Sequence, residues 1–178
     1  VNGEIYGTGI LRKYLLFPQK SGRLTIGPFQ VDAIVQKKVQ GQSRSIFDDF
    51  FGSFENVRMP VKSDPVGVQV RSLPAGKPSD FSGGVGSYDI QASLDKEQVP
   101  ANEGVTYTLE ISGKGNLKVL ESPRVEFAPD LEVYDPKVSN NINVSEGGAR
   151  GTKTIEYLII PRHAGNYQIP PVSLSYFD

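Results

Sequence analysis

Cysteine and tryptophan are missing from this sequence of 178 residues, and histidine and methionine occur once each. Without cysteine the chain can form neither a disulfide nor a thiolate metal site. No apolar run approaches the roughly 18 residues that a membrane-spanning helix needs. The first residues, Val1 to Glu4, lack the basic start and apolar core of a signal peptide. Thiol chemistry and a membrane span are therefore not expected in this stretch.

The sequence also has no large excess of positive or negative charge. Lys and Arg number 19 and Asp and Glu number 20, so the net charge of −1 argues against a general nucleic-acid-binding protein. Hydrophobic residues make up 38% and charged residues 22%, which is typical of a folded soluble chain. The 19 glycines and 13 prolines are frequent breaks in the pattern, and they predict many short strands joined by turns.

An internal repeat organises the chain. The sequence Tyr14–Pro18 (YLLFP) returns as Tyr157–Pro161 (YLIIP). The likeness continues in register through the positions that follow, Gly22 with Gly165, Ile26 with Ile169, Pro28 with Pro171 and Val31 with Leu174. In each copy a proline ends a strand because it cannot donate to a ladder, and a glycine then supports a turn. The repeat predicts the same strand–turn–strand ending twice, in two modules.

The second copy closes a full set of predicted strands. Apolar and polar residues alternate over 88–94 and 105–111, and shorter strands are expected at 118–120, 125–127, 131–134, 142–144, 152–160 and 172–176. About seven short strands in roughly 95 residues are typical of an immunoglobulin-like β-sandwich. His163–Tyr167 (HAGNY) also resembles the tyrosine corner of such folds.

The predicted fold class is therefore all-β, with tandem immunoglobulin-like β-sandwich modules of which the first is incomplete. Residues 1–72 are expected to be the C-terminal part of a first module, with an insertion at about 36–64. Residues 73–86, which contain Leu73-Pro74-Ala75-Gly76, form the expected linker, and 87–178 form the complete second module.

Four phenylalanines stand out in the insertion. Phe47, Phe50, Phe51 and Phe54 are spaced i, i+3, i+4 and i+7, which places their rings on one face of a short helix. Ser45, three residues before Asp48, has the form of a helix-capping pair. This stripe either packs on its own sheet or on the incomplete module, or it docks into a partner's groove or on a membrane surface, and disorder is a third possibility. These four residues are the candidate partner-binding site.

A search for chemistry predicts no catalytic, cofactor-binding or metal-binding residues. The lone His163 lies in a predicted corner, where a solvated role is expected. No Gly-x-Ser-x-Gly elbow and no phosphate-binding loop occurs, and Gly83–Gly86 is interpreted as a flexible lead-in to a strand. The basic residues Lys37, Lys38 and Arg44 have no interleaved aromatics to stack on bases. We therefore expect a protein without enzymatic activity.

Several segments together resemble the BatD (aerotolerance, or oxygen-tolerance) family. They include Leu94-Asp95-Lys96, Val99–Thr106, Ile111–Leu117, Val133–Val138 and Glu156–Gly165. Phe81–Gly86 and the Asp-Asp-Phe-Phe sequence of the insertion are similar as well. The resemblance extends over nearly the whole chain, and none of its motifs is catalytic.

The resemblance implies a bacterial, membrane-anchored envelope protein whose immunoglobulin-like modules face the periplasm at the inner membrane, of which this chain is a soluble fragment. It also implies partners, namely Bat-type proteins with von Willebrand factor A domains or tetratricopeptide repeats, in a system linked to MoxR-type ATPases. The expected function is thus a protein-interaction or scaffold module. The alternative is an adhesin or glycan-binding module, for which the pool of aromatic residues is Tyr6, Tyr14, Tyr88, Tyr134 and Tyr176.

Overall fold

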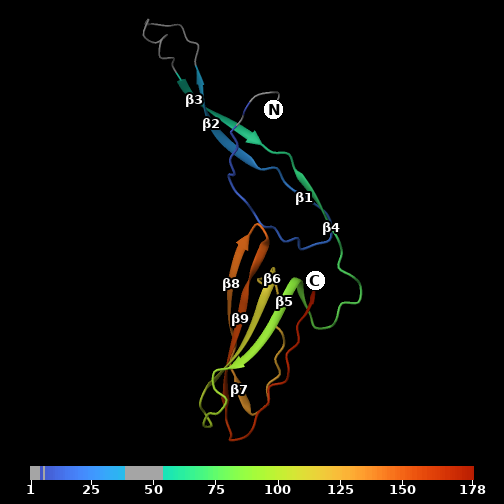
Figure 1. Ribbon diagram of the computed structural model, residues 1–178, viewed down its shortest axis with the longest axis vertical. Helices are drawn as coiled ribbons and strands as arrows, with labels where there is room; N and C mark the ends of the chain where they lie inside the picture. Colours follow the sequence, from blue (N-terminus) through green and yellow to red (C-terminus); the bar gives the residue numbers. More distant parts are fainter. Residues whose placement is uncertain (1–4, 6, 39–53) are drawn as a thin grey trace. The chain divides into compact units, whose positions relative to one another are not determined.

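The computed structural model describes residue 5, residues 7–38 and residues 54–178. Every regular element within these ranges is a strand, which confirms the predicted all-β class (Figure 1). In this described part no helix is long and apolar enough to cross a membrane. The chain divides into two compact units, Val1–Phe17 with Leu73–Asp178, and Pro18–Ser72.

The smaller unit is a two-stranded ribbon. Strand β1 (Gly22–Ile26) pairs antiparallel with β4 (Val66–Val70), and β2 (Gln30–Lys38) pairs antiparallel with β3 (Phe54–Lys62). The two ladders share one register, since Ile26 lies opposite Val66 and Gln30 lies opposite Lys62. Pro28 and Pro65, which have no N–H to donate, lie in the interruption between the ladders. Most described side chains of the ribbon are exposed, because two strands alone have no layer to pack against.

The ribbon changes two predictions about the insertion. Strand β2 continues to Lys38 and β3 begins at Phe54, so both strands extend into the predicted insertion at 36–64. Alternation explains β3, because Val57, Met59 and Val61 alternate with polar Asn56 and Arg58 and pair in register with β2. Phe54 is a strand residue rather than the last residue of a helix. The rest of the predicted helix lies outside the described residues.

The two copies of the repeat fold differently, contrary to the prediction. Tyr157–Pro161 is the end of a strand in the larger unit, whereas Tyr14–Phe17 forms no strand. A strand is stabilised by neighbours on its sheet. The second copy has such neighbours on both sides, while the two-stranded ribbon that follows the first copy includes none of Tyr14–Phe17. Tandem sandwich modules are therefore not shown.

The larger unit is built on one six-stranded sheet. Its strands are β5 (Phe81–Leu94), β6 (Val105–Gly115), β7 (Leu131–Val133), β8 (Lys137–Ser145), β9 (Gly148–Pro161) and β10 (Ser175–Phe177). The order is β10-β5-β6-β9-β7, and β8 also pairs with β9. All pairs are antiparallel except β10 with β5. The neighbouring strands β5, β6, β9 and β8 correspond in order to the A-B-E-D sheet of immunoglobulin-like domains.

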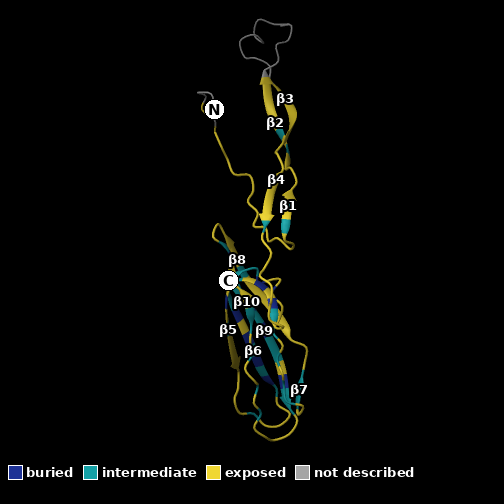
Figure 2. Ribbon diagram, turned by 90° about the vertical axis from the view of Figure 1, so that its right-hand side faces the viewer, coloured by how far each residue is buried: buried dark blue, intermediate teal, exposed yellow. Residues whose placement is uncertain are grey.

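The hydrophobic core lies on one face of this sheet. Period-2 alternation places Tyr107, Leu109 and Ile111 of β6 beside Ile155 and Ile159 of β9, and all five side chains are buried (Figure 2). Extended chain at 116–130 and 162–174 covers this face. Residues from both segments pack on the core, namely Leu117, Leu120, Val125, Phe127, Ile169, Val172 and Leu174.

The two segments that cover the core, 116–130 and 162–174, contain less regular strand than predicted. No strand forms at the predicted 118–120 and 125–127, and of the predicted strand at 172–176 only the last two residues lie in a strand, β10. Pro123, Pro129, Pro170 and Pro171 lie in the covering segments, and each removes a donor that a ladder would need. These segments still bury apolar side chains, so the domain keeps the two layers of an immunoglobulin-like β-sandwich with one regular sheet. Strand β5 also begins at Phe81, inside the predicted linker 73–86, because β10 pairs with its first residues.

Candidate functional site

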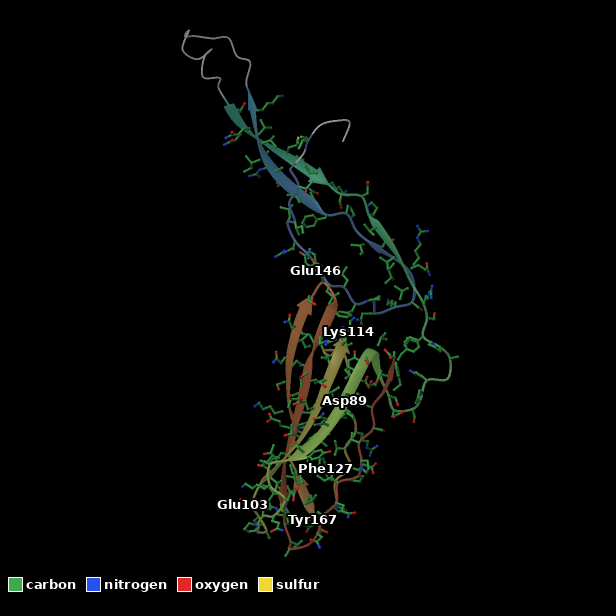
Figure 3. All side chains as sticks on the ribbon, in the orientation of Figure 1. Asp89, Glu103, Lys114, Phe127, Glu146 and Tyr167 are labelled. Atoms are coloured by element: carbon green, nitrogen blue, oxygen red, sulfur yellow. The ribbon has the colours of Figure 1, made fainter. Side chains whose placement is uncertain are left out.

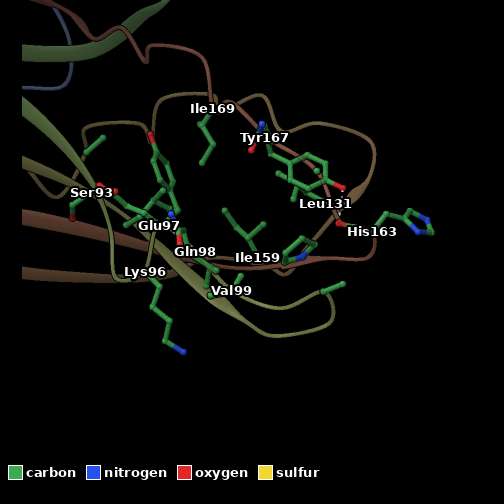
Figure 4. Close-up of a pocket in the computed structure, with 18 of the residues that line it drawn as sticks. Ser93, Lys96, Glu97, Gln98, Val99, Leu131, Ile159, His163, Tyr167 and Ile169 are labelled. Carbon is green, nitrogen blue, oxygen red and sulfur yellow. Dashed lines mark hydrogen bonds between the residues drawn. The ribbon is translucent and has the colours of Figure 1, made fainter.

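An open groove with a volume of about 1050 Å³ lies in the larger unit. It lies where β5 ends, β6 begins and β9 ends. One wall is Ala92–Leu94 and the loop that follows, and the other is the chain at 163–172. Figure 4 shows Val99, Ile159 and Ile169 directed into the hollow, with Lys96 and His163 pointing outward. The core residues Val105, Tyr107 and Ile159 form its floor.

A tyrosine corner holds one wall of the groove. The Tyr167 hydroxyl donates a hydrogen bond of 2.9 Å to the main-chain oxygen of His163, four residues earlier (Figure 4). This is the bond that defines the corner in immunoglobulin-like domains, and the sequence pattern predicted its position. His163 itself is exposed, as expected for a lone histidine in a corner.

Arg162 joins three segments beside the groove. Its guanidinium donates to Glu132 of β7 through Nε at 2.6 Å and to the Asn102 side chain through Nη1 at 3.1 Å. The main-chain N–H of Asn102 in turn donates to the oxygen of Pro161 at 2.8 Å. Hydrogen bonds from the Tyr134 hydroxyl and from Arg162 lower the pKa of Glu132. The loop before β6, strand β7 and the corner are thereby fixed relative to one another.

The groove lies beside an unpaired sheet edge. Strand β10 pairs with β5 only at Phe81 and Val85, and from Gly86 to Leu94 the described strands include a partner for β5 on one side alone, β6. The N–H of Asp95 donates to Thr106 of the β6 strand at 3.1 Å. Because main-chain groups alternate in direction along a strand, those of Ile90, Ala92 and Leu94 face away from β6. This stretch, Ile90–Leu94, is called the free edge below.

Acidic side chains border the free edge. Asp89 and Glu97 are exposed, and among the residues that the structure describes neither forms an ion pair (Figure 3 shows Asp89). Asp95 accepts a hydrogen bond of 2.7 Å from the N–H of Thr106. Lys96, the cation within this group, is bound to Glu103 at 2.6 Å, which raises the pKa of Lys96. Asp89 shares a shallow hollow with Lys114 and Arg150, so the field is negative at the Asp95–Glu97 end of the edge, where it favours a cationic ligand.

The opposite face of the sheet is polar. Its register places Ser112 between Asp89 and Thr152, and Lys114 between Ser87 and Arg150. Short hydroxyl side chains between longer charged ones leave a shallow hollow of about 530 Å³ at this place. Figure 3 shows Lys114 at the end of the sheet far from Tyr167. This face has no apolar floor, unlike the groove.

The four phenylalanines of the predicted site are not brought together by the described structure. Phe47, Phe50 and Phe51 lie outside the described residues, and Phe54 begins β3. The groove was missed from sequence because its walls, at 92–101 and 163–172, are far apart along the chain. The prolines on both walls were the available signal, since they prevent a regular ladder from closing this end.

The tyrosines of the alternative, a glycan-binding surface, do not form one platform. Tyr88 is a core residue with 7% of its surface exposed, and the ring of Tyr176 packs edge-on against it at 5.3 Å. Tyr134 donates its hydroxyl to Glu132 at 2.7 Å, and Tyr14 is exposed elsewhere. Tyr6 lies outside the described residues. Within the described ranges, no cluster of three or more His, Asp or Glu side chains could hold a metal ion.

Comparison with known proteins gives one match. No curated protein and no solved structure matches this chain. A family model, described as the BatD DUF11 like domain, matches residues 92–178. The matched range begins at the free edge and contains both walls of the groove, the tyrosine corner and strands β6 to β10. The sequence resemblance to the BatD family is thus confirmed for residues 92–178.

Proposed function

We propose that this chain is a non-enzymatic protein-interaction module of an envelope-associated BatD protein, and that it binds its partner at the groove. The BatD family match supports an envelope association. The adhesin alternative is not favoured by a particular feature of the structure, because its tyrosines are dispersed.

The observation that carries the proposal is the exposed apolar surface on the β5 wall of the groove, above a floor of core residues. Ala92 and Leu94 lie on the core face of β5, yet both are exposed, with 43% of the Leu94 surface accessible. Exposed apolar surface next to a core is a usual sign of a binding site. Rigid walls favour binding, since a preformed site loses little conformational entropy when it is filled. The tyrosine corner and the Arg162 bonds supply that rigidity.

The family resemblance directs the choice of partners. We propose envelope proteins with von Willebrand factor A domains or tetratricopeptide repeats, in a system linked to MoxR-type ATPases, and a location on the periplasmic side of the bacterial inner membrane.

Site-specific photocrosslinking tests this function. A photoreactive amino acid is placed at Val99, which lines the groove, and in a second version at Ser139 on β8, outside it. Both versions are expressed in bacterial envelopes, irradiated and analysed by mass spectrometry. We expect a defined protein adduct from position 99 and not from position 139. Equal adducts from both positions, or none from position 99, would show that the groove is not the binding site.

A further inference from the structure

We propose that the free edge of β5 binds an extended strand of a partner protein, which runs parallel to β5 and places alternate apolar side chains in the groove. This inference rests on the proposed function and deepens it by naming the ligand class. The ligand is a peptide segment in β-conformation with alternating apolar and basic residues.

The edge already accepts a strand at its other end. Strand β10 pairs in parallel with the first part of β5, where Ser175 lies opposite Phe81 and Phe177 lies opposite Val85. A ligand strand at Ile90–Leu94 would occupy the same side of β5, in the same line and with the same direction. Strand addition at an exposed edge is a common mode of peptide recognition, in which main-chain hydrogen bonds give affinity.

The free edge supplies both the main-chain hydrogen-bonding groups and apolar side chains of the site. The main-chain groups of Ile90, Ala92 and Leu94 face outward. Their side chains lie on the core face, where Ala92 and Leu94 line the groove. A paired strand directs every second side chain to that same face. Its apolar residues would therefore enter the groove beside Leu94 and cover the floor formed by Tyr107 and Ile159.

Charge determines which residues are favoured at the ligand positions that do not enter the groove. Side chains of the added strand that do not enter the groove and lie at the end of the edge would be near Asp95 and Glu97. Opposite charges on neighbouring strands stabilise pairing and like charges destabilise it. Lysine or arginine at these positions is thus favoured over glutamate or aspartate.

A peptide of alternating lysine and valine is the probe, and its control replaces every lysine by glutamate. Binding is measured by fluorescence anisotropy with the full chain and three variants at one position, Ala92→Pro, Ala92→Val and Ala92→Trp. Proline removes the outward N–H of residue 92, and an edge strand tolerates this change. Valine keeps the N–H at a similar size, and tryptophan fills the groove. Thermal melting confirms that each variant is folded.

We expect the lysine peptide to bind and the glutamate peptide not to. Ala92→Pro should weaken binding by roughly 3- to 10-fold, the effect of one lost hydrogen bond, with little change for Ala92→Val. The proposal of strand addition is wrong if Ala92→Trp abolishes binding while Ala92→Pro and Ala92→Val bind the peptide equally well. In that case the groove binds the ligand without main-chain pairing at residue 92. That result leaves the proposed function intact, whereas the crosslinking experiment tests the function independently.

A strand fused to the chain tests whether the free edge pairs with a partner's strand or with a segment of the same chain. The same lysine–valine sequence is fused after Asp178, and hydrogen exchange is measured at Ile90, Ala92 and Leu94. A fused strand that fills the edge should protect these amides and exclude the free peptide. If the fused strand protects them but the free peptide never binds, even at millimolar concentration, the edge serves intramolecular pairing, and the proposal of a partner strand is overturned.

Discussion

The Lys153 ammonium group donates a hydrogen bond to the main-chain oxygen of Leu120, across the core of the larger unit. Lys153 lies on the core face of β9, opposite Ile111 of β6, and only 7% of its surface is exposed. Leu120 belongs to the first covering segment and is fully buried. One side chain thus connects the regular sheet to the layer that has no ladder of its own.

Replacement of Lys153 tests this connection. In Lys153→Ala the Leu120 oxygen loses its donor, and an unsatisfied buried acceptor costs about 1–3 kcal/mol of unfolding free energy. Lys153→Met, which keeps the apolar stem, should cost less because it preserves packing and removes a buried charge. Urea denaturation of both variants measures the difference. Equal stability of Lys153→Ala and the unmodified chain would contradict the assigned role.

Lys153 also predicts a dependence on alkaline pH. Burial lowers the pKa of this amine from its usual 10.5, because the charged form is desolvated. Between the lowered pKa and 10.5 the unfolded chain binds more protons than the folded one, so rising pH increases the free energy of unfolding. Burial raises the pKa of Tyr88, Tyr107 and Tyr157, which opposes this trend at high pH.

Comparison with Lys153→Met isolates the lysine, because the tyrosines are common to both proteins. We expect the stability of the unmodified chain relative to Lys153→Met to rise as the pH approaches 10.5. Chemical denaturation at a series of alkaline pH values measures it. A relative stability that stays constant or falls would show that Lys153 is not desolvated in the folded state.

A pH dependence of the same sign, stability rising with pH, is expected in the acid range from Glu132. Tyr134 and Arg162 lower the pKa of this carboxyl group from 4.5, so the folded state holds fewer protons than the unfolded state below that value. Its stabilising contribution is present above pH 4.5 and is lost as the pH falls through the lowered pKa. Glu132→Gln should therefore reduce the acid-dependent drop in melting temperature. Glu126→Gln is the control, since the Glu126 side chain is exposed and forms no ion pair with any residue that the structure describes.

The tyrosine corner gives a third prediction. Tyr167→Phe removes the hydrogen bond to the His163 oxygen but keeps the ring, and we expect a loss of about 0.5–1.5 kcal/mol. Tyr134→Phe is a matched control at a more exposed hydroxyl, with a smaller expected effect. Equilibrium unfolding in urea compares the two. The corner would be dispensable if Tyr134→Phe proved the more harmful substitution.

A fourth prediction concerns two glycines of β6 that accommodate the Tyr88 ring. A Cβ atom at Gly115 would lie 2.1 Å from the Tyr88 hydroxyl oxygen, and at Gly113 a Cβ would lie 2.1 Å from the main-chain oxygen of Ser87. Both glycines have positive φ, 144° and 155°. Gly115→Ala should destabilise the fold by about 1–3 kcal/mol through strain and overpacking.

Gly165→Ala is the control for this substitution, because its added Cβ would meet the Tyr167 ring at ordinary contact distance, 3.5 Å or more. Thermal melting of both variants gives the comparison. A Gly115→Ala variant as stable as Gly165→Ala would mean that β6 accepts side chains at this position.

Some elements could be predicted from sequence because their signal is local. Strands β5, β6 and β9 follow from period-2 alternation, and the tyrosine corner follows from the pattern at 163–167. The covering layer was predicted as strands because Val125, Phe127 and Leu174 are apolar, but its prolines exclude a ladder while still permitting burial. The groove depends on which distant segments fold together, and no local pattern around Ala92 or Ile169 carries that information.

The shared register of the ribbon in the smaller unit has a consequence for how it folds. A slip of one residue between β1 and β4 would turn each side chain to the other surface of the ribbon, and the same slip would be forced on β2 and β3. The hydrogen bond from the Ser63 N–H to the Phe29 oxygen, 2.8 Å long, lies at the junction and fits only the native alignment. The pairing of β1 with β4 and the pairing of β2 with β3 therefore fix the same register. A hairpin that forms out of register would be mispaired along its entire length.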